Sequence, residues 1–330
     1  MNFNEEFLRR AIQLGESGLG LTFPNPIVGA LILDQDGTLL GEGYHTGGDH
    51  AEILAILDAK SKGFSLKGAT LYCSLEPCNH YGTTPPCSEA IIESGISSVY
   101  FALSDPNRLA SGGAAKLLGA GLLVKGDLLS VEAAYSNRAW LTKIAKGRPR
   151  ITAKIAQTLD GRVAAADGQS KWITGEASRE HAKRLRDGFD AICIGTGTAL
   201  ADDPRLRGAT RNPARYVIGK RLLPNLLLDG EEGYRQIETH STHDVTEEFA
   251  LRGFNSVLIE GGPMLLSAFL EADLVDEIQL YIAGSIMGSG KPSVEIPEFK
   301  NFSQQLHYEI SSLSILDNDI FATYLKRDIN

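Results

Sequence analysis

The chain has 330 residues, of which 43% are hydrophobic and 22% are charged, and its formal net charge is −9. This composition supplies a core and excludes global disorder, and at roughly 100–200 residues per domain the length predicts two domains. The acidic balance argues against a nucleic-acid binder that works through a broad basic surface. The longest apolar stretches, such as Ile27–Leu33, are far shorter than the roughly 18 residues that span a bilayer, so we expect no membrane segment. Because the first residues lack the pattern of a secretory signal, we expect a cytoplasmic protein.

Helix and strand patterns alternate over the first 145 residues. Apolar residues at helical spacing around Phe7 predict a first helix, Ile27–Leu33 predicts a buried strand, and Asp36-Gly37 is typical of a hairpin turn. The next predicted elements are a helix over 50–60, a strand over 69–75, a helix over 85–94 and a strand over 97–103. This alternation predicts a largely parallel sheet with helices on both faces.

The segment KGRPR (146–150) interrupts the pattern, so we expect one domain over 1–146 and a second over 147–330. The strands predicted in the second domain are 151–156, 191–197, 214–219, 255–262 and 277–284. The last stretch, 307–327, has the pattern of two strands joined by a turn. The second sheet is therefore expected to finish antiparallel.

Three residues have the spacing and chemistry of a zinc site: His50, Cys78 and Cys87. Zinc prefers imidazole and thiolate ligands, and three protein ligands leave a fourth position for water, which is the catalytic arrangement. His50 and Cys87 both fall where helices are expected to begin, and a helix N-terminus favours a thiolate. Glu52 follows His50 by two residues and is expected outside the ligand set, as the proton shuttle of a zinc-dependent base deaminase.

Each of these residues alone has an ordinary structural explanation, His50 as a helix cap and the two cysteines as small buried hydrophobes. Together they favour a metal site over those explanations. Cys73 and Cys193 are expected in the core, because each lies in an apolar strand. His80 is open to two interpretations, a further ligand or a substrate contact, and the second is favoured.

The motif HAE (50–52) followed by LEPCNHYGTTPPC (75–87) resembles the bifunctional deaminase–reductases of riboflavin biosynthesis. The resemblance continues through PNPIVG, GEGYH and DPN, and in the second half through KIAQTLDGR, SKWITG, TALADDPRL and the stretch from IEGGP to LYIA. It implies an α/β protein, with a cytidine-deaminase-like three-layer α/β/α domain followed by a dihydrofolate-reductase-like domain. It also implies a cytoplasmic enzyme, usually a homo-oligomer, with a small phosphorylated pyrimidine as substrate and neither nucleic acid nor membrane as partner.

Two reactions are implied, using Zn²⁺ in the first half and NADPH in the second. The first is hydrolytic deamination of 2,5-diamino-6-ribosylamino-4(3H)-pyrimidinone 5′-phosphate, and the second reduces the ribosyl side chain to ribityl. Carried over by position, the zinc ligands are His50, Cys78 and Cys87, with Glu52 as the catalytic proton donor. The implied substrate-binding residues are Asn25, His45, His80, Asp105, Asn107, Ser170, Arg186, Leu206 and Glu260. The implied cofactor-binding residues are Ala156, Trp172, Thr198, Asp202, Gly262, Pro263, Met264, Leu265, Leu266, Ser267 and Ala268.

The sequence departs from the family pattern at several places. Thr83 stands where a Lys or Arg is usual, and RLASGGA replaces a stretch with Pro and spaced glycines after Asn107. Gly219-Lys220 stands where an Asp-Ser-like pair usually follows the strand, and the segment after it is short. Lys220 has the chemistry to meet an anionic cofactor as a point charge.

These departures keep open an active deaminase with an impaired reductase half, and a zinc deaminase that acts on another base also stays open. A nucleic-acid base deaminase is disfavoured by the acidic charge and by the lack of a basic, aromatic-rich groove. A non-catalytic zinc module is disfavoured because only three ligands are clear and Glu52 lies outside them.

Overall fold

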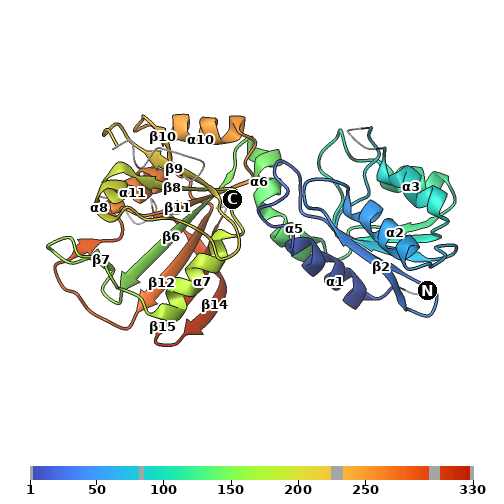
Figure 1. Ribbon diagram of the computed structural model, residues 1–330, viewed down its shortest axis with the longest axis horizontal. Coiled ribbons are helices and arrows are strands. Elements are labelled where there is room, and N and C mark those ends of the chain that lie inside the picture. Colours follow the sequence, from blue (N-terminus) through green and yellow to red (C-terminus); the bar gives the residue numbers. More distant parts are fainter. Residues whose placement is uncertain (1–2, 82–84, 224–232, 297–304, 328–330) are drawn as a thin grey trace. The chain divides into compact units, whose positions relative to one another are not determined.

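The structure is a computed structural model and describes residues 3–81, 85–223, 233–296 and 305–327 (Figure 1). The chain forms two compact units, Met1–Lys146 and Gly147–Asn330, and each is described by itself. Within the described residues, no helix combines the length and apolar character that crossing a bilayer requires.

Five strands form the sheet of the first unit. They are β1 (Gly29–Leu33), β2 (Leu39–Tyr44), β3 (Thr70–Cys73), β4 (Ser98–Phe101) and β5 (Leu123–Lys125). Their order is β2-β1-β3-β4-β5; β1 is antiparallel to both neighbours, whereas β3, β4 and β5 are parallel. The expectation of a largely parallel sheet was therefore wrong for β1. The hairpin at Asp36-Gly37 explains its pairing with β2, because so short a connection joins only antiparallel strands.

Helices cover both faces of this sheet, as predicted. They are α1 (Glu5–Glu16), α2 (Ala51–Ser61), α3 (Cys87–Ser94), α4 (Gly113–Gly119), α5 (Ser130–Ser136) and α6 (Arg138–Lys146). Side chains alternate along a strand, so Ala30 and Ile32 of β1 pack with α2, α3 and α4, whereas Leu31 and Leu33 pack with α1 and α5. This arrangement is a three-layer α/β/α unit with two separate cores.

Eight strands form the main sheet of the second unit. They are β6 (Arg150–Thr158), β8 (Ala191–Gly195), β9 (Ala214–Ile218), β10 (Arg235–Ile237), β11 (Ser256–Glu260), β12 (Glu277–Ala283), β14 (Tyr308–Leu316) and β15 (Asp319–Lys326). The order is β10-β9-β8-β11-β6-β12-β15-β14, parallel from β10 to β12 and antiparallel thereafter. The predicted antiparallel finish is confirmed. A small separate pair consists of β7 (Arg162–Ala164) and β13 (Lys291–Pro292).

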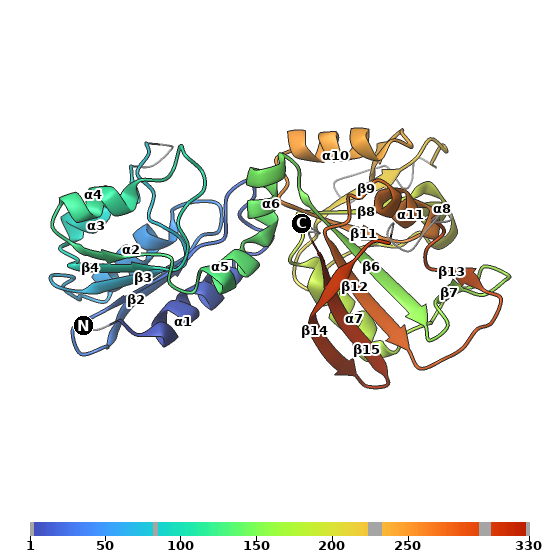
Figure 2. The ribbon, with the colours of Figure 1, turned by 180° about the vertical axis from the view of Figure 1, so that it is seen from behind.

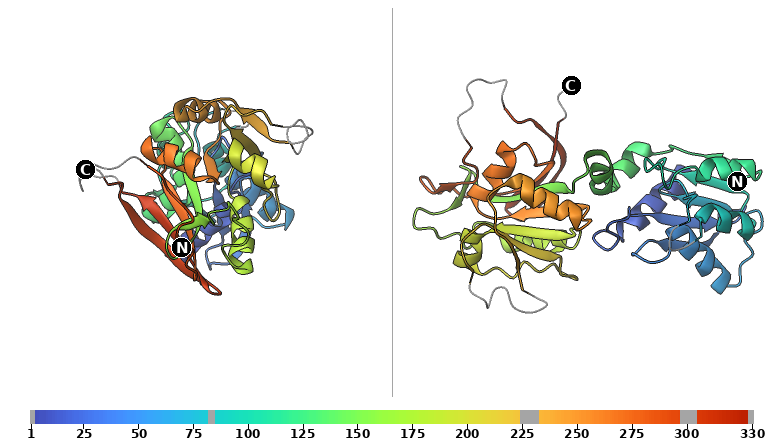
Figure 3. Two further views of the ribbon diagram at one scale, coloured as in Figure 1. Left: turned by 90° about the vertical axis from the view of Figure 1, so that its left-hand side faces the viewer. Right: turned by 90° about the horizontal axis from the view of Figure 1, so that it is seen from above.

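Helices lie on both sides of this sheet (Figure 3). They are α7 (Glu176–Arg186), α8 (Thr196–Asp202), α10 (Thr242–Leu251) and α11 (Pro263–Glu271). Phe249 of α10 and Phe269 of α11 are fully buried in one core with β6, β8, β9 and β11. Ala182 of α7 packs on Tyr281 and Phe321 at the opposite face. Because the strands from β10 to β12 are parallel, their carboxyl ends lie at one edge of the sheet. This is the edge where ligands bind in open α/β sheets.

Candidate functional site

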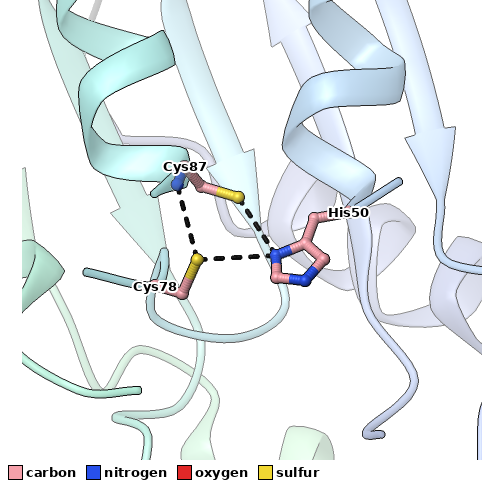
Figure 4. A group of neighbouring side chains, drawn as sticks. All are labelled: His50, Cys78 and Cys87. Atoms are coloured by element: carbon pink, nitrogen blue, oxygen red, sulfur yellow. Dashed lines mark hydrogen bonds between the residues drawn. The ribbon is translucent and has the colours of Figure 1, made fainter. Parts of the chain in front are cut away.

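The three residues of the predicted zinc site converge from separate elements (Figure 4). His50 is the N-cap of α2, but its side chain makes no capping hydrogen bond, so the imidazole is free of that structural role. Cys87 is the first residue of α3, and Cys78 lies on the loop that follows β3. The Nδ1 atom of His50 lies 3.2 Å from Sγ of Cys87 and 3.5 Å from Sγ of Cys78.

These spacings fit a zinc ion. Zn–S bonds of about 2.3 Å and Zn–N bonds of about 2.0 Å place the N and S ligands of a tetrahedron about 3.5 Å apart. The three ligand atoms all lie within 4.8 Å of one another. The donor set of one imidazole and two thiols has the chemistry of zinc, and the ligands leave one corner of the tetrahedron for a water or substrate atom.

The electrostatics of the cluster favour one thiolate, at Cys78, and leave the second thiol dependent on a cation. Hydrogen bonds from Cys87 and from His50 hold the pKa of Cys78 down to about 4. The same interaction with Cys78 raises the pKa of Cys87, because two adjacent sulfurs resist carrying two negative charges without a cation between them. A bound divalent cation removes that resistance, which couples metal binding to proton release.

Glu52 lies in the first turn of α2 and is only 3% exposed. Burial raises the pKa of its carboxyl to about 7, and the nearby charge of Cys78 adds to the shift. It also hydrogen-bonds with the Cys87 side chain. A carboxyl group beside the ligands, with its pKa near the working pH, suits transfer of a proton in either direction.

Asn25 and His45 lie beside this cluster. Nδ2 of Asn25 is 3.4 Å from Nε2 of His45, and Nδ1 of His45 is 3.0 Å from the carbonyl oxygen of Asp49. The His45 and His50 rings meet edge to face with 5.6 Å between centroids. Because a carbonyl oxygen can only accept, Nδ1 of His45 donates to it, which leaves Nε2 facing the Asn25 amide. Burial lowers the pKa of His45.

Asp105 lies near Cys78 of the cluster, and His80 lies near Asp105. The Nδ1 atom of His80 is buried without a hydrogen-bond partner among the described residues. Burial raises the pKa of Asp105, and the charges of Glu76, Cys78 and His80 act on it, which places all three close to its carboxyl. Asn107 donates its backbone N–H to Asp105 over 2.8 Å, so the two predicted pocket residues share one turn.

Glu76 has a role that the sequence analysis missed. Its buried carboxylate accepts backbone hydrogen bonds from Asp105, Gly112 and Ala114, at 3.2, 3.1 and 3.0 Å. Gly113 lies against the same segment, where a Cβ atom would come within 1.7 Å of the Pro77 oxygen. Glu76 thereby holds the loop that carries Asp105 beside Cys78. The Glu-Pro-Cys motif was the only signal in the sequence for this function.

A second cluster lies in the other unit, where Arg186 and Glu260 form a two-point ion pair. The distances are 2.5 Å from Nε to Oε1 and 2.8 Å from Nη2 to Oε2. Lys154 of β6, which the sequence analysis did not name, approaches Oε2 of Glu260 at 3.7 Å. Burial opposes ionisation of Glu260, but the two cations outweigh burial and lower its pKa. A lysine within an otherwise apolar strand was the available signal.

Some predicted residues of the second unit join this cluster and others do not. Arg186 donates through Nη1 to the Arg207 carbonyl at 3.0 Å, so the neighbouring Leu206 is brought close to the ion pair. Ser170 and Trp172 lie between β7 and α7. The guanidinium carbon of Arg179 stacks on the Trp172 ring, 4.5 Å from the ring centroid. In the described parts of the chain, no hydrogen bond or ring contact joins Ser170 or Trp172 to Arg186 or Glu260. Ala156 packs with the core beneath α7.

The predicted cofactor segment begins at a tight turn after β11. Gly261 and Gly262 have φ of 126° and 51°, conformations that favour glycine. Thr198 of α8 lies against both, with its side chain 3.0–3.2 Å from where their Cβ atoms would be. Pro263, Met264, Leu265 and Ala268 are at least partly exposed on α11, whereas Leu266 and Ser267 are buried. Leu266 belongs to the core, so only its backbone is available to a ligand.

The neighbouring strand ends complete this edge of the sheet. Asp202 ends α8 and is half-buried. Nε2 of Gln236 donates to the carbonyls of Gly219 and Arg221, at 2.7 and 2.8 Å, which fixes the backbone on both sides of the exposed Lys220. Thr83, and most of the short segment that follows Lys220, lie outside the described residues.

Comparisons with known proteins agree with both halves of this description. The pattern of the cytidine and deoxycytidylate deaminase zinc-binding region matches residues 1–103, and the pattern of the RibD C-terminal domain matches residues 149–322. A crystal structure from Thermotoga maritima, described as a diaminohydroxyphosphoribosylaminopyrimidine deaminase/5-amino-6-(5-phosphoribosylamino)uracil reductase, superposes with a TM-score of 0.89 at 32% identity over 98% of both chains. An Acinetobacter baumannii RibD structure superposes with a TM-score of 0.88 at 33% identity, covering 98% of this chain and 99% of that one.

The fold and the two sites define a bifunctional enzyme, a zinc-dependent deaminase joined to an NADPH-dependent reductase. The riboflavin biosynthesis protein RibD of Mycobacterium tuberculosis is 39% identical over 98% of this chain and 97% of its own length. That of Escherichia coli K12 is 35% identical over 87% of this chain and 89% of its own. The chain therefore belongs to the RibD family, whose deaminase and reductase serve riboflavin biosynthesis, and the predicted family, fold class and cofactors are confirmed.

Proposed function

We propose that this chain deaminates 2,5-diamino-6-ribosylamino-4(3H)-pyrimidinone 5′-phosphate in residues 1–146 and reduces the ribosyl side chain with NADPH in residues 147–330. The observation that supports this most directly is the convergence of His50, Cys78 and Cys87 beside the buried Glu52. We propose that the first three hold zinc and that Glu52 is the catalytic proton carrier. When bound, zinc supplies Lewis-acid activation of the attacking water.

The residues around the zinc ligands divide the remaining work of the first site. Glu52 takes a proton from the attacking water and delivers it to the leaving amino group, since its pKa of about 7 lets it hold either state. We assign substrate binding to Asn25, His45, His80, Asp105 and Asn107. The unpartnered Nδ1 of His80 supports this assignment, because a buried polar atom needs a partner that the substrate can supply.

In the second unit we assign substrate binding to Ser170, Arg186, Leu206 and Glu260. We assign the cofactor to the carboxyl ends of β8, β9 and β11. The proposed contacts there are Thr198, Asp202 and the segment 262–268, and we add Ala156 of β6 and Trp172, which lies between β7 and α7. The tight turn at Gly261–Gly262 supports the assignment, since exposed backbone N–H groups before α11 suit a phosphate. Lys220 adds a positive charge at the end of the neighbouring strand, where it meets a further phosphate of NADPH.

Product analysis by mass, after incubation of the purified protein with the diamino substrate with and without NADPH, tests this assignment. We expect deaminated product without NADPH and the ribityl product with it. Deaminated product alone in both reactions would favour the second candidate, a deaminase with an impaired reductase, which the short segment after Lys220 motivates. No product in either reaction would favour deamination of another base.

The two sites are proposed to work independently. Glu52→Gln should abolish deamination but leave reduction of the already deaminated intermediate intact. Asp202→Ala should do the opposite, because Asp202 belongs to the other unit. Loss of both activities in either variant would contradict the division at Lys146. We further propose a cytoplasmic homo-oligomer that acts without nucleic acid or membrane; its four free cysteines suit a reducing compartment.

A further inference from the structure

The indole ring of Trp172 is contacted by a cation on one face while most of the residue is open to solvent. Trp172 is 72% exposed, and the guanidinium of Arg179 lies over its ring at 4.5 Å from the centroid. Nη1 of the same guanidinium donates to the carbonyl oxygen of Thr174 at 2.8 Å. Arg179 therefore ties both the ring and the backbone that follows it to α7. The ring keeps exposed apolar surface on which a planar ligand can stack.

The start of α7 is anchored by a buried carboxylate from a strand far along the chain. The N-cap residue Gly175 has no side chain, so it makes no side-chain capping hydrogen bond. Oδ2 of Asp319, the first residue of β15 and only 5% exposed, accepts from the Gly175 N–H at 2.7 Å and from Oγ of Ser178 at 2.6 Å. A carboxylate at a helix N-terminus is also favourable electrostatically. This contact fixes the end of the segment 170–175, which carries Trp172, to the sheet.

The anchor lies at the edge of the sheet where ligands are expected. Ile282, near the end of β12, pairs with Ile320, near the start of β15, so Asp319 lies beside the carboxyl end of β12. The carbonyl oxygen of Asn318 would lie 3.5 Å from a Cβ on Gly284, just beyond that end. Figure 2 shows α7 lying against β12 and β15. The two contacts thereby hold the segment 170–175 at the edge to which we assign the cofactor.

We propose that Arg179 and Asp319 are positioning residues for NADPH, which hold the Trp172 ring in place for a planar ring of the cofactor. This inference rests on the assignment of Trp172 to the cofactor under the proposed function. An exposed tryptophan without such contacts samples several rotamers and loses that freedom when a ligand stacks on it. A ring that is fixed before binding avoids this loss of entropy, which raises the affinity for the ligand.

The fluorescence of Trp172 tests the role of Arg179. Trp140, in the first unit, is the only other tryptophan, so Trp140→Phe leaves Trp172 as the single emitter. Time-resolved anisotropy then reports ring rotation without ligand, and quenching of the emission by NADPH gives the Kd. Arg179→Ala should increase ring rotation and raise the Kd about tenfold, as expected for the loss of one cation–π contact and one hydrogen bond. Arg184→Ala removes the same side chain from an exposed position on α7 and should change neither quantity.

A second pair of variants tests the anchor. Because a single oxygen of Asp319 accepts both hydrogen bonds, Asp319→Asn can retain them, whereas Asp319→Ala loses both. Asp319→Ala should raise the Kd about tenfold, and Asp319→Asn should recover it to within about threefold of the wild type, since only the charge is lost. The KM for NADPH should rise with the Kd while kcat changes little. Circular dichroism and deaminase activity check that the variants are folded, and subtracting the signal of Trp172→Phe replaces Trp140→Phe if that variant is unstable.

The outcomes separate this inference from the function on which it rests. Equal ring rotation and equal Kd in Arg179→Ala and Arg184→Ala would overturn the role of Arg179. Asp319→Asn that binds NADPH as weakly as Asp319→Ala would overturn the role of Asp319. Wild type that oxidises NADPH while the Trp172 emission stays unchanged would overturn the assignment of Trp172 and this inference with it. Wild type that binds NADPH with quenching but does not oxidise it would contradict the proposed reductase activity alone.

Discussion

Replacing Glu260 by Gln tests whether the ion cluster of the second unit holds the fold as well as the ligand. The wild-type carboxylate is 6% exposed and accepts two hydrogen bonds from Arg186, with Lys154 at 3.7 Å. Gln cannot accept at both positions, and it leaves two cations beside each other in a poorly solvated site. Removing one partner of a buried pair costs about 3–5 kcal/mol. Because Arg186 and Lys154 remain 19% and 22% exposed, we expect the lower end, about 3 kcal/mol.

For a unit of this size, about 3 kcal/mol lowers the Tm by about 6–12 °C. Differential scanning calorimetry of the full chain measures this change in Tm. Deaminase activity after heating reports on the first unit, and we expect that activity to be the same in wild type and variant. Glu271→Gln in the same unit is the matched control, since Glu271 is exposed at the end of α11. A change in Tm below about 3 °C in Glu260→Gln would refute the argument that this pair stabilises the unit.

We also predict how the stability difference between wild type and Glu260→Gln depends on pH. The pKa of Glu260 is lower in the folded protein than its ordinary value of 4.5, because the cations outweigh burial. Its contribution to stability is therefore fully present above pH 4.5 and is lost as the pH falls through the folded-state pKa. The Tm difference between wild type and Glu260→Gln should stay constant from neutral pH down to about pH 4.5. It should shrink as the pH falls further, through the folded-state pKa of Glu260. A difference that shrank already near neutral pH would contradict this assignment.

Three further predictions concern the sites. Cys87→Ala should lose most bound zinc in metal analysis, because it removes one of three protein ligands. The control Cys193→Ala, in the core of the other unit, should retain its zinc. Equal zinc contents in the two variants would contradict the proposed site. Glu52→Gln should retain zinc and fold but lose deamination by at least about 10²-fold in a steady-state assay, and near-normal turnover would refute its role. Lys220→Ala should raise the KM for NADPH about tenfold with little change in kcat. The control Lys183→Ala on α7 should leave this KM unchanged. A KM for NADPH in Lys220→Ala equal to that of the control would contradict a role for Lys220 in cofactor binding.

The sequence alone predicted the zinc cluster, because its chemistry depends on residue types that few other sites combine. It also predicted the strands β6, β8, β9, β11 and β12, whose apolar runs each end at or shortly before a glycine. The resemblance to a family then assigned the second site. Glu260 had a local signal, since it ends an apolar strand directly before Gly261-Gly262, whereas Arg186 had none that distinguished it from an ordinary surface charge.

Tertiary structure decided the features that depend on contacts between distant segments. The carboxylate of Glu76 holds a loop about 30 residues further along the chain, and Lys154 approaches Glu260 only because β6 and β11 are neighbours in the sheet. The direction of β1 also depended on which strands it pairs with. Sequence patterns show that β14 is half apolar, but whether another element covers its isoleucines depends on the packing of the whole unit. A periodic pattern determines which side chains share a face; only the assembled sheet determines what lies against that face.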